Sequence, residues 1–290
     1  MSAGATFRQI LAKKGLVEAM AAHSPLSALL AAEAGFDAVW ASGFELSAMY
    51  GVPDVSIVSM TQHLDMTRAM AERSGLPVVA DIDTGFGNAI NVLYAVEQYE
   101  RAGAAAIVME DKSFPKVTSL IAGGRQDMVR IEEFQGKIDA ARTARRDKDF
   151  VIVARTEALI AGLGQEEALK RARAYEAAGA DMILVHSKQK TPDEIEAFVK
   201  AWDGTVPIAL VPTAYPQMTV ARVRELRKIG LLIWGNHAIR ASVDAMRRTF
   251  ARIRKDGGIH GVEADIASVE DVFELQGMGK VKDDEKRFLR

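Results

Sequence analysis

The chain has 290 residues, and its 37 Lys and Arg residues nearly balance its 39 Asp and Glu residues, for a formal net charge of −2. Such an even balance leaves no electrostatic footprint for nucleic acid or an anionic membrane, so we expect a small metabolite as the partner. The absence of cysteine excludes disulfides, thiolate metal sites and a cysteine nucleophile.

The N-terminal stretch through Ala32 is rich in Ala and Leu. Lys13, Lys14 and Glu18 interrupt it, so it resembles neither a signal peptide nor a membrane span. We therefore expect a cytoplasmic protein without a membrane partner.

Short apolar runs alternate with helical stretches along the chain. Several runs follow a Gly that closes a helical stretch, as at Ala34-Gly35 and Ala178-Gly179, a pattern typical of βαβ units in a parallel sheet. The expected strands are residues 16–20, 38–42, 78–83, 106–110, 151–155, 182–186, 206–211 and 231–236. The expected helices are residues 25–34, 60–74, 89–102, 130–146, 165–178, 191–202, 219–228 and 237–255.

This alternation, without a break in composition, predicts an α/β fold: a (β/α)8 barrel of the TIM type as a single domain over residues 1–290. Residues 256–290 remain as a C-terminal helical extension, with one further helix at 268–275, and a role in packing against a partner subunit is expected. An open doubly wound sheet is the alternative, but no Gly-rich dinucleotide fingerprint follows any strand.

Polar residues close nearly every apolar run, and in such a barrel the active site lies at these strand ends. They are His23, Ser42, Asp81 with Asp83, Glu110 with Asp111, Arg155, His186, Thr213 and Asn236. Each alone could cap a helix or satisfy backbone groups. Three carboxylates meeting at one barrel mouth, Asp81, Asp83 and Glu110, would repel one another without a cation, which predicts a Mg2+ site.

Arg155 and His186 would supply hydrogen-bond donors for an anionic substrate, since Arg binds carboxylates and phosphonates through two parallel bonds. The alternatives are that Arg155 is a buried partner of one of the acids and that His186 is a satisfied core histidine.

The connection from Glu110 to Arg125 is long and carries Lys112, Lys116, Thr118 and Ser119. Long loops in compact folds often form lids, and this one would bring charge over a bound anion. Alternatively, its lysines form an ordinary solvated surface.

Several motifs together resemble the phosphoenolpyruvate mutase/isocitrate lyase superfamily over most of the chain. They are Trp40-Ala-Ser-Gly-Phe44, Ala80-Asp-Ile-Asp-Thr-Gly-Phe-Gly87, Met109-Glu-Asp-Lys-Ser-Phe-Pro-Lys-Val-Thr-Ser119, Ala154-Arg155 and Val185-His186. The resemblance implies a Mg2+ enzyme, with Mn2+ or Co2+ as substitutes, whose last helix is exchanged between subunits of a homotetramer built as a dimer of dimers.

The same resemblance implies roles for individual residues. Asp81 would bind Mg2+ directly, with Asp83 and Glu110 acting through metal-bound water. The implied substrate-binding residues are Trp40, Ser42, Gly43, Phe44, Asp81, Ser119, Arg155 and His186. The implied catalytic residues are Asp54, Lys116, Thr118, Arg155 and His186.

Two features choose among branches of the superfamily. Isocitrate and 2-methylisocitrate lyases use a loop cysteine, and this chain has none. The loop reads Lys116-Val-Thr-Ser119, where the mutases have Lys-x-Asn-Ser, and Thr118 indicates hydrolysis of the carbon–phosphorus bond of 3-phosphonopyruvate to pyruvate and phosphate. The alternatives are the mutase reaction, a carbon–carbon lyase or hydrolase acting on a 2-oxo acid such as oxaloacetate, or a barrel that binds a 2-oxo acid without turnover.

Overall fold

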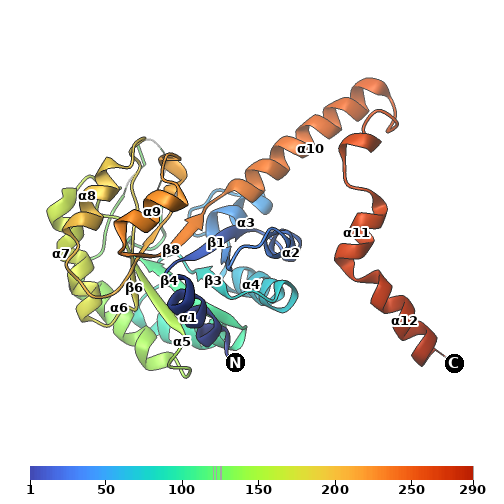
Figure 1. Ribbon diagram of the computed structural model, residues 1–290. Coiled ribbons are helices and arrows are strands. Elements are labelled where there is room, and N and C mark those ends of the chain that lie inside the picture. Colours follow the sequence, from blue (N-terminus) through green and yellow to red (C-terminus); the bar gives the residue numbers. More distant parts are fainter. Residues whose placement is uncertain (120, 122, 125, 290) are drawn as a thin grey trace. The chain divides into compact units, whose positions relative to one another are not determined.

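The structure, a computed structural model, describes residues 1–289 apart from 120, 122 and 125. Eight parallel strands close into a barrel in sequence order, with β1 pairing with both β2 and β8 (Figure 1). The strands are β1 Val17–Ala22, β2 Ala38–Ala41, β3 Val78–Asp81, β4 Ala104–Glu110, β5 Val151–Thr156, β6 Met182–Val185, β7 Ile208–Leu210 and β8 Ile229–Trp234. The predicted barrel is confirmed.

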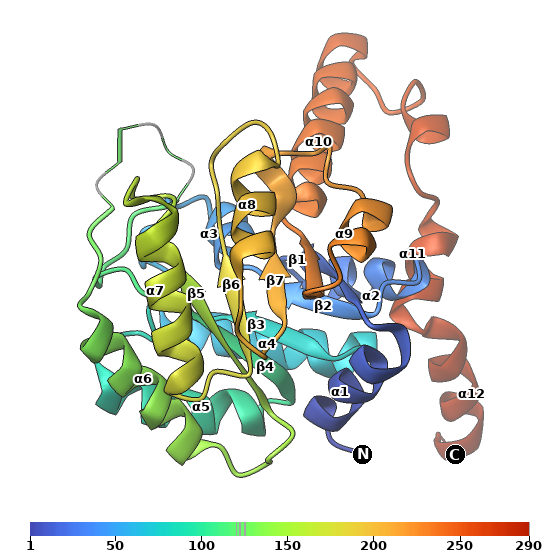
Figure 2. The same ribbon diagram turned by 60° about the vertical axis from the view of Figure 1, so that its left-hand side comes forward.

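Helices alternate with the strands, and α6 and α7 flank β5 on its outer side (Figure 2). The helices up to β8 are α1 Ala3–Lys14, α2 Pro25–Glu33, α3 Gly43–Met49, α4 Met60–Ser74, α5 Ala89–Arg101, α6 Ile131–Ala144, α7 Gly164–Ala177, α8 Asp193–Ala201 and α9 Val220–Leu226, with a 3-10 turn η1 at Pro212–Ala214.

Side chains alternate along each strand between the barrel interior and the helix layer. On β5, Val151 and Val153 belong to the interior cluster, whereas Ile152 and Ala154 belong to the cluster between strands and helices. This alternation carries forward to the strand end, so that Arg155 points into the barrel mouth.

Two helices within residues 1–237 were not among the expected elements. Helix α1 begins at the cap Ser2, ends at Gly15 with a φ of 71°, and buries Phe7 in the interior cluster, where it packs with the strand residues of the barrel. Helix α3 begins directly after β2, with the Ser42 hydroxyl accepting a hydrogen bond from the Glu45 amide. Its polar N-cap is therefore also a residue of the barrel mouth.

Residues 238–290 form a second compact unit, distinct from residues 1–237. It contains most of α10 His237–Asp256, then η2 Glu263–Asp265, α11 Val269–Gln276 and α12 Met278–Phe288. The expected extension at 256–290 lies within this unit, and α12 had not been expected as a separate helix. None of the described helices is long and apolar enough to cross a membrane.

Candidate active site

A cavity of about 190 Å³ opens at the carboxyl ends of the strands. Its lining residues are Trp40, Ser42, Phe44, Asp54, Asp81, Lys116, Thr118, Ser119, Arg155, His186, Val211, Thr213, Gly235 and Asn236. The predicted site residues outside this lining lie directly against it. The Gly43 amide is 3.4 Å from Asp81 Oδ2, Asp83 is 2.7 Å from Lys116 Nζ, and Glu110 is 3.3 Å from Arg155 Nε.

The turn after β3 brings two carboxylates together, and the strand expected over residues 78–83 ends before Asp83. Strand β3 ends at Asp81, and Asp83 has a φ of 50°, in the left-handed region that Asp tolerates better than most residues. The Asp83 carbonyl accepts a hydrogen bond from the Glu110 amide, at 2.8 Å, which fixes the turn to the end of β4. The turn therefore orients Asp83 toward the side chains of Asp81 and Lys116.

Lys116 is the cation at the centre of this group. Its Nζ lies 2.7 Å from Asp83 Oδ1 and 3.1 Å from Asp54 Oδ1, and only 5% of its side chain is exposed. Burial opposes its charge, but Asp83 and Asp54 outweigh that effect and hold the pKa of Lys116 well above its usual value. Burial raises the pKa of Asp83 to about 7 and that of Asp81 above its usual value, against the opposing effect of Lys116.

The surrounding charges and donors fit a hard divalent cation. Both carboxylate oxygens of Glu110 are buried and, within the described residues, lack a hydrogen-bond partner. Burial and like charge disfavour ionisation of Asp81 and Asp83, a cost that a divalent cation would remove. Carboxylate oxygens are also the ligands that Mg2+ prefers. No three His, Asp or Glu side chains are grouped as metal ligands in the described part of the chain, and Lys116 and Arg155 occupy positions beside the acids.

His186 is held in one tautomer by Arg155. Arg155 Nη2 lies 3.0 Å from His186 Nδ1, and because a guanidinium only donates, Nδ1 must accept. The ring proton then sits on Nε2, which is buried and has no hydrogen-bond partner among the described residues. Burial, and then the Arg155 charge, lower the pKa of His186. His186 is therefore a neutral donor suited to an oxygen of an anionic ligand.

Two buried charges lie behind the cavity, of which Glu157 was not expected from the sequence and Lys112 was expected only as one of the charges of the long loop. Glu157 is fully buried and contacts Arg155 Nε at 2.6 Å, and Lys112 is 1% exposed and lies 3.1 Å from Glu157. Each follows a predicted site residue by two positions, Glu157 after Arg155 and Lys112 after Glu110. The period of two that directs Arg155 and Glu110 inward would have found them.

Other strand-end residues have different surroundings. His23 Nδ1 lies 3.0 Å from Glu45 Oε2, and His23 does not line the cavity. Asp111 accepts hydrogen bonds from Tyr175 and Thr156, at 2.6 and 3.1 Å, and so joins β4 and β5 to α7. Burial raises the pKa of Asp111 to about 6. Thr213 and Asn236 do line the cavity.

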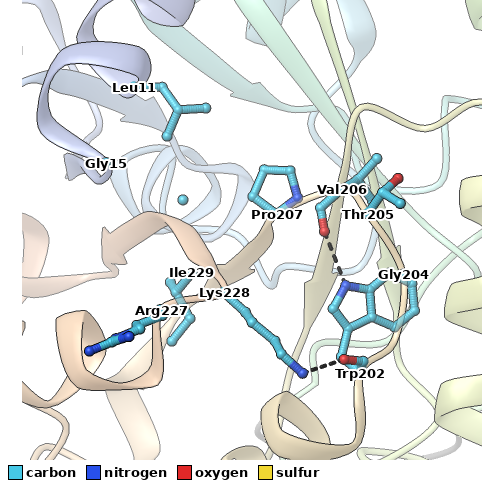
Figure 3. Close-up of a pocket in the computed structure, with 11 residues that line it drawn as sticks. Leu11, Gly15, Trp202, Gly204, Thr205, Val206, Pro207, Arg227, Lys228 and Ile229 are labelled. Carbon is cyan, nitrogen blue, oxygen red and sulfur yellow. Dashed lines mark hydrogen bonds between the residues drawn. The ribbon is translucent and has the colours of Figure 1, made fainter.

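A hollow of about 360 Å³ lies away from this chemistry, beside the amino ends of β7 and β8 (Figure 3). Lys228 there donates to the carbonyls of Lys200, at 3.2 Å, and Trp202, while the Trp202 indole donates to the Val206 carbonyl at 3.0 Å. No acid or histidine is among its described lining residues. Although this hollow is larger, the convergence of acids and donors assigns the active site to the carboxyl-end cavity.

The fold and this mouth define a metal-assisted enzyme of the TIM-barrel class that acts on a small anion. The chain belongs to the phosphoenolpyruvate phosphomutase family, whose model matches residues 7–254. This finding confirms the resemblance seen in the sequence motifs.

Individual relatives refine the comparison. The chain is 61% identical to a phosphonopyruvate hydrolase of Variovorax sp. (strain Pal2) over 290 residues, covering 100% of both chains. It is 44% identical to a phosphoenolpyruvate phosphomutase of Tetrahymena pyriformis, covering 97% of this chain and 94% of the relative. A crystal structure of phosphonopyruvate hydrolase in complex with oxalate and Mg2+ superimposes with a TM-score of 0.95 at 59% identity, covering 100% of both chains.

Proposed function

We propose that the chain catalyses the Mg2+-dependent hydrolysis of the carbon–phosphorus bond of 3-phosphonopyruvate, giving pyruvate and phosphate. The observation that carries the proposal is the cavity itself, in which Asp81, Arg155, His186 and the loop residue Thr118 face the same space. The 61% identity to a phosphonopyruvate hydrolase, against 44% to a mutase, favours hydrolysis over rearrangement.

The substrate carries negative charge at both ends, and the mouth offers donors from several elements. The Arg155 guanidinium and the Lys116 ammonium neutralise the phosphonate oxygens, and the neutral His186 donates a hydrogen bond to them from Nε2. Ser42, Gly43 and Phe44, at the start of α3, offer a hydroxyl and backbone amides to the carboxylate end, while Trp40 also lines the cavity. Ser119, on the loop after β4, also lines the cavity and would contact the substrate there.

The reaction breaks the carbon–phosphorus bond, whose electron pair stays on C3 of the pyruvate unit. The water oxygen bonds to phosphorus, and C3 takes up a proton. Transfer of this kind depends mainly on positioning and on charge neutralisation. Thr118 and Asp54, both lining the cavity, orient the attacking water.

Asp81 would bind Mg2+ directly, and Asp83 and Glu110 would act through metal-bound water. When bound, the metal would neutralise the substrate carboxylate and stabilise the negative charge that develops on the keto oxygen as the carbon–phosphorus bond breaks. Mn2+ or Co2+ would substitute, because each accepts the same oxygen ligands.

Phosphorus NMR on the purified protein with phosphonopyruvate and Mg2+, beside an EDTA control, tests the proposal. Inorganic phosphate formed only with metal supports it. Phosphoenolpyruvate formed instead would establish the mutase reaction, and an unchanged spectrum would direct the search to carbon–carbon substrates such as oxaloacetate.

We also propose that the chain forms a homotetramer, a dimer of dimers in which C-terminal helices are exchanged. The support is the second unit, in which the large apolar side chains of Met246, Phe250, Val269, Phe273 and Phe288 are 45%, 64%, 63%, 47% and 64% exposed. Met246 and Phe250 share one face of α10, and so much exposed apolar surface calls for a covering subunit. Light scattering on the full chain and on Phe250→Asp would test this, since the charge should dissociate the assembly.

A cytoplasmic location remains part of the proposal. Fractionation of cells that express the chain with an epitope tag would test it.

A further inference from the structure

We propose that Glu157 is a positioning residue that couples the loop carrying Thr118 to the anion-binding pair Arg155 and His186. This inference deepens the proposed function and rests on it. Glu157 is fully buried and is not among the described residues that line the cavity, so it acts through its neighbours.

The two oxygens of this carboxylate serve different elements. Oε1 accepts from Arg155 Nε at 2.6 Å and lies 3.5 Å from His186 Nδ1, both on strand ends of the barrel. Oε2 accepts from the Ser119 hydroxyl at 2.5 Å and lies 3.1 Å from Lys112 Nζ, both on the loop after β4. A single buried carboxylate therefore joins Arg155, the residue that orients His186, to the loop.

The residues on both sides of Thr118 are held by hydrogen bonds. On one side, Lys112 Nζ donates to the Val117 carbonyl at 2.8 Å, and on the other, Ser119 is bonded to Glu157. Thr118 is therefore held between two residues whose positions depend on the Glu157 charge. A shift at Glu157 would move the loop hydroxyl and the Arg155 guanidinium together.

The hydrogen-bond donors that surround residue 157 require an acceptor at this position. The Ser119 oxygen already accepts from Lys112 Nζ at 2.7 Å and from Arg155 Nη2 at 3.0 Å, so its one proton must go to Glu157. Lys112 and Arg155 can only donate. A glutamine there would turn its NH2 group toward either Ser119 and Lys112 or Arg155, and each orientation sets donor against donor.

Glu157 is itself fixed from behind. Its amide donates to Asp111 Oδ1 at 2.9 Å, and Asp111 also accepts from Tyr175 and Thr156. Because β4, β5 and α7 all meet at Asp111, the Glu157 backbone is held by the barrel frame while its side chain reaches the mouth.

The test compares three variants by two readouts. Glu157→Gln removes the charge, Glu157→Asp keeps it on a shorter side chain, and Glu176→Gln is the matched control. Glu176 accepts from the Thr205 and Val206 amides, at 2.6 and 3.0 Å, far from the cavity lining. The readouts are the kcat and KM for phosphate release, and the rate of tryptic cleavage after Lys112 and Lys116, followed by mass spectrometry.

Glu157→Gln should lower kcat/KM about 100-fold, the scale of a misplaced catalytic constellation, and should speed cleavage after both lysines. Glu157→Asp should recover part of each loss, and Glu176→Gln should change neither. Unchanged kinetics in Glu157→Gln, or an equal loss in the control, would overturn the proposal. Faster cleavage with unaltered kinetics would overturn the coupling, because Glu157 would then hold only the loop.

If the proposed function is wrong, the wild-type chain will release no phosphate from phosphonopyruvate with Mg2+, and the kinetic readout will be lost. The coupling would be judged by calorimetric titration of oxalate with Mg2+ present, together with the cleavage rates. Weaker oxalate binding and faster cleavage in Glu157→Gln alone would support it, and equal values in all variants would refute it.

Discussion

Replacing Lys116 with methionine removes a buried cation while keeping most of its volume. Lys116 lies within 3.1 Å of both Asp54 and Asp83, and only 5% of its side chain is exposed. Breaking a buried ion pair by removing one partner costs about 3–5 kcal/mol, because the remaining charge is left unpaired. Each kcal/mol lowers the Tm of a chain of this size by about 2–4 °C.

The remaining carboxylates should respond by binding protons. Lys116 lowers the pKa of Asp83, which burial nevertheless raises to about 7. Without Lys116 the pKa of Asp83 rises further, so the carboxyl group stays protonated to higher pH. Because a proton competes with a metal ion for this carboxylate, the pH at which Mg2+ binds well should also rise.

The assay is the Mg2+ concentration that gives half-maximal phosphate release, measured from about pH 6 to about pH 9, a range that brackets the pKa of Asp83. Lys116→Arg, which keeps the charge, is the control. We expect the Lys116→Met curve to be displaced to higher pH, and the Lys116→Arg curve to stay near that of the wild type. Coincident curves for the wild type and Lys116→Met would refute the assigned electrostatic role of Lys116.

Three further predictions concern the metal, the water and the fold. Asp81→Ala should abolish the Mg2+-dependent activity, and retained activity that no longer responds to EDTA would contradict the metal assignment. Thr118→Ala should reduce phosphate release while oxalate binding with Mg2+ persists, and an undiminished rate would exclude Thr118 from orienting water. Burial lowers the pKa of His63 from 6.5 to about 4, so the unfolded chain binds a proton that the folded protein does not, and stability falls as the pH drops through this interval, by about 3 kcal/mol. The Tm of His63→Gln should therefore fall less between these pH values than that of the wild type, as differential scanning fluorimetry would show.

Helix-capping residues in the sequence led to the prediction of one helix but did not reveal another. Helix α4 was expected at residues 60–74 and is found there, because Ser59 and Gln62 form a capping box and Gly75 ends the helix with a φ of 67°. Helix α1 was missed although Ser2 and Gly15 cap it. What selects the helix is the burial of Phe7 in the barrel interior, a tertiary contact that local sequence does not show.

The candidate site was predictable as far as strand ends define it. Asp81, Arg155 and His186 face the cavity because inward positions alternate along each strand. The pairing of Lys116 with Asp54 and Asp83 depends on the path of a long loop, which spacing does not determine. The same holds for Asp83, whose positive φ ends the strand alternation that had been expected to continue.

Some residues of the active site lie on strand ends and others lie on the loop after β4. This difference affects how the reaction of the site can change over evolution. Asp81 and Arg155 are buried among opposite charges, so altering either also costs folding energy. Thr118 lies on a connection held in place chiefly by its neighbours, through Lys112 and Ser119. New side chains can therefore be sampled at position 118 at little cost to the barrel, which makes it an accessible place for one reaction to give way to another.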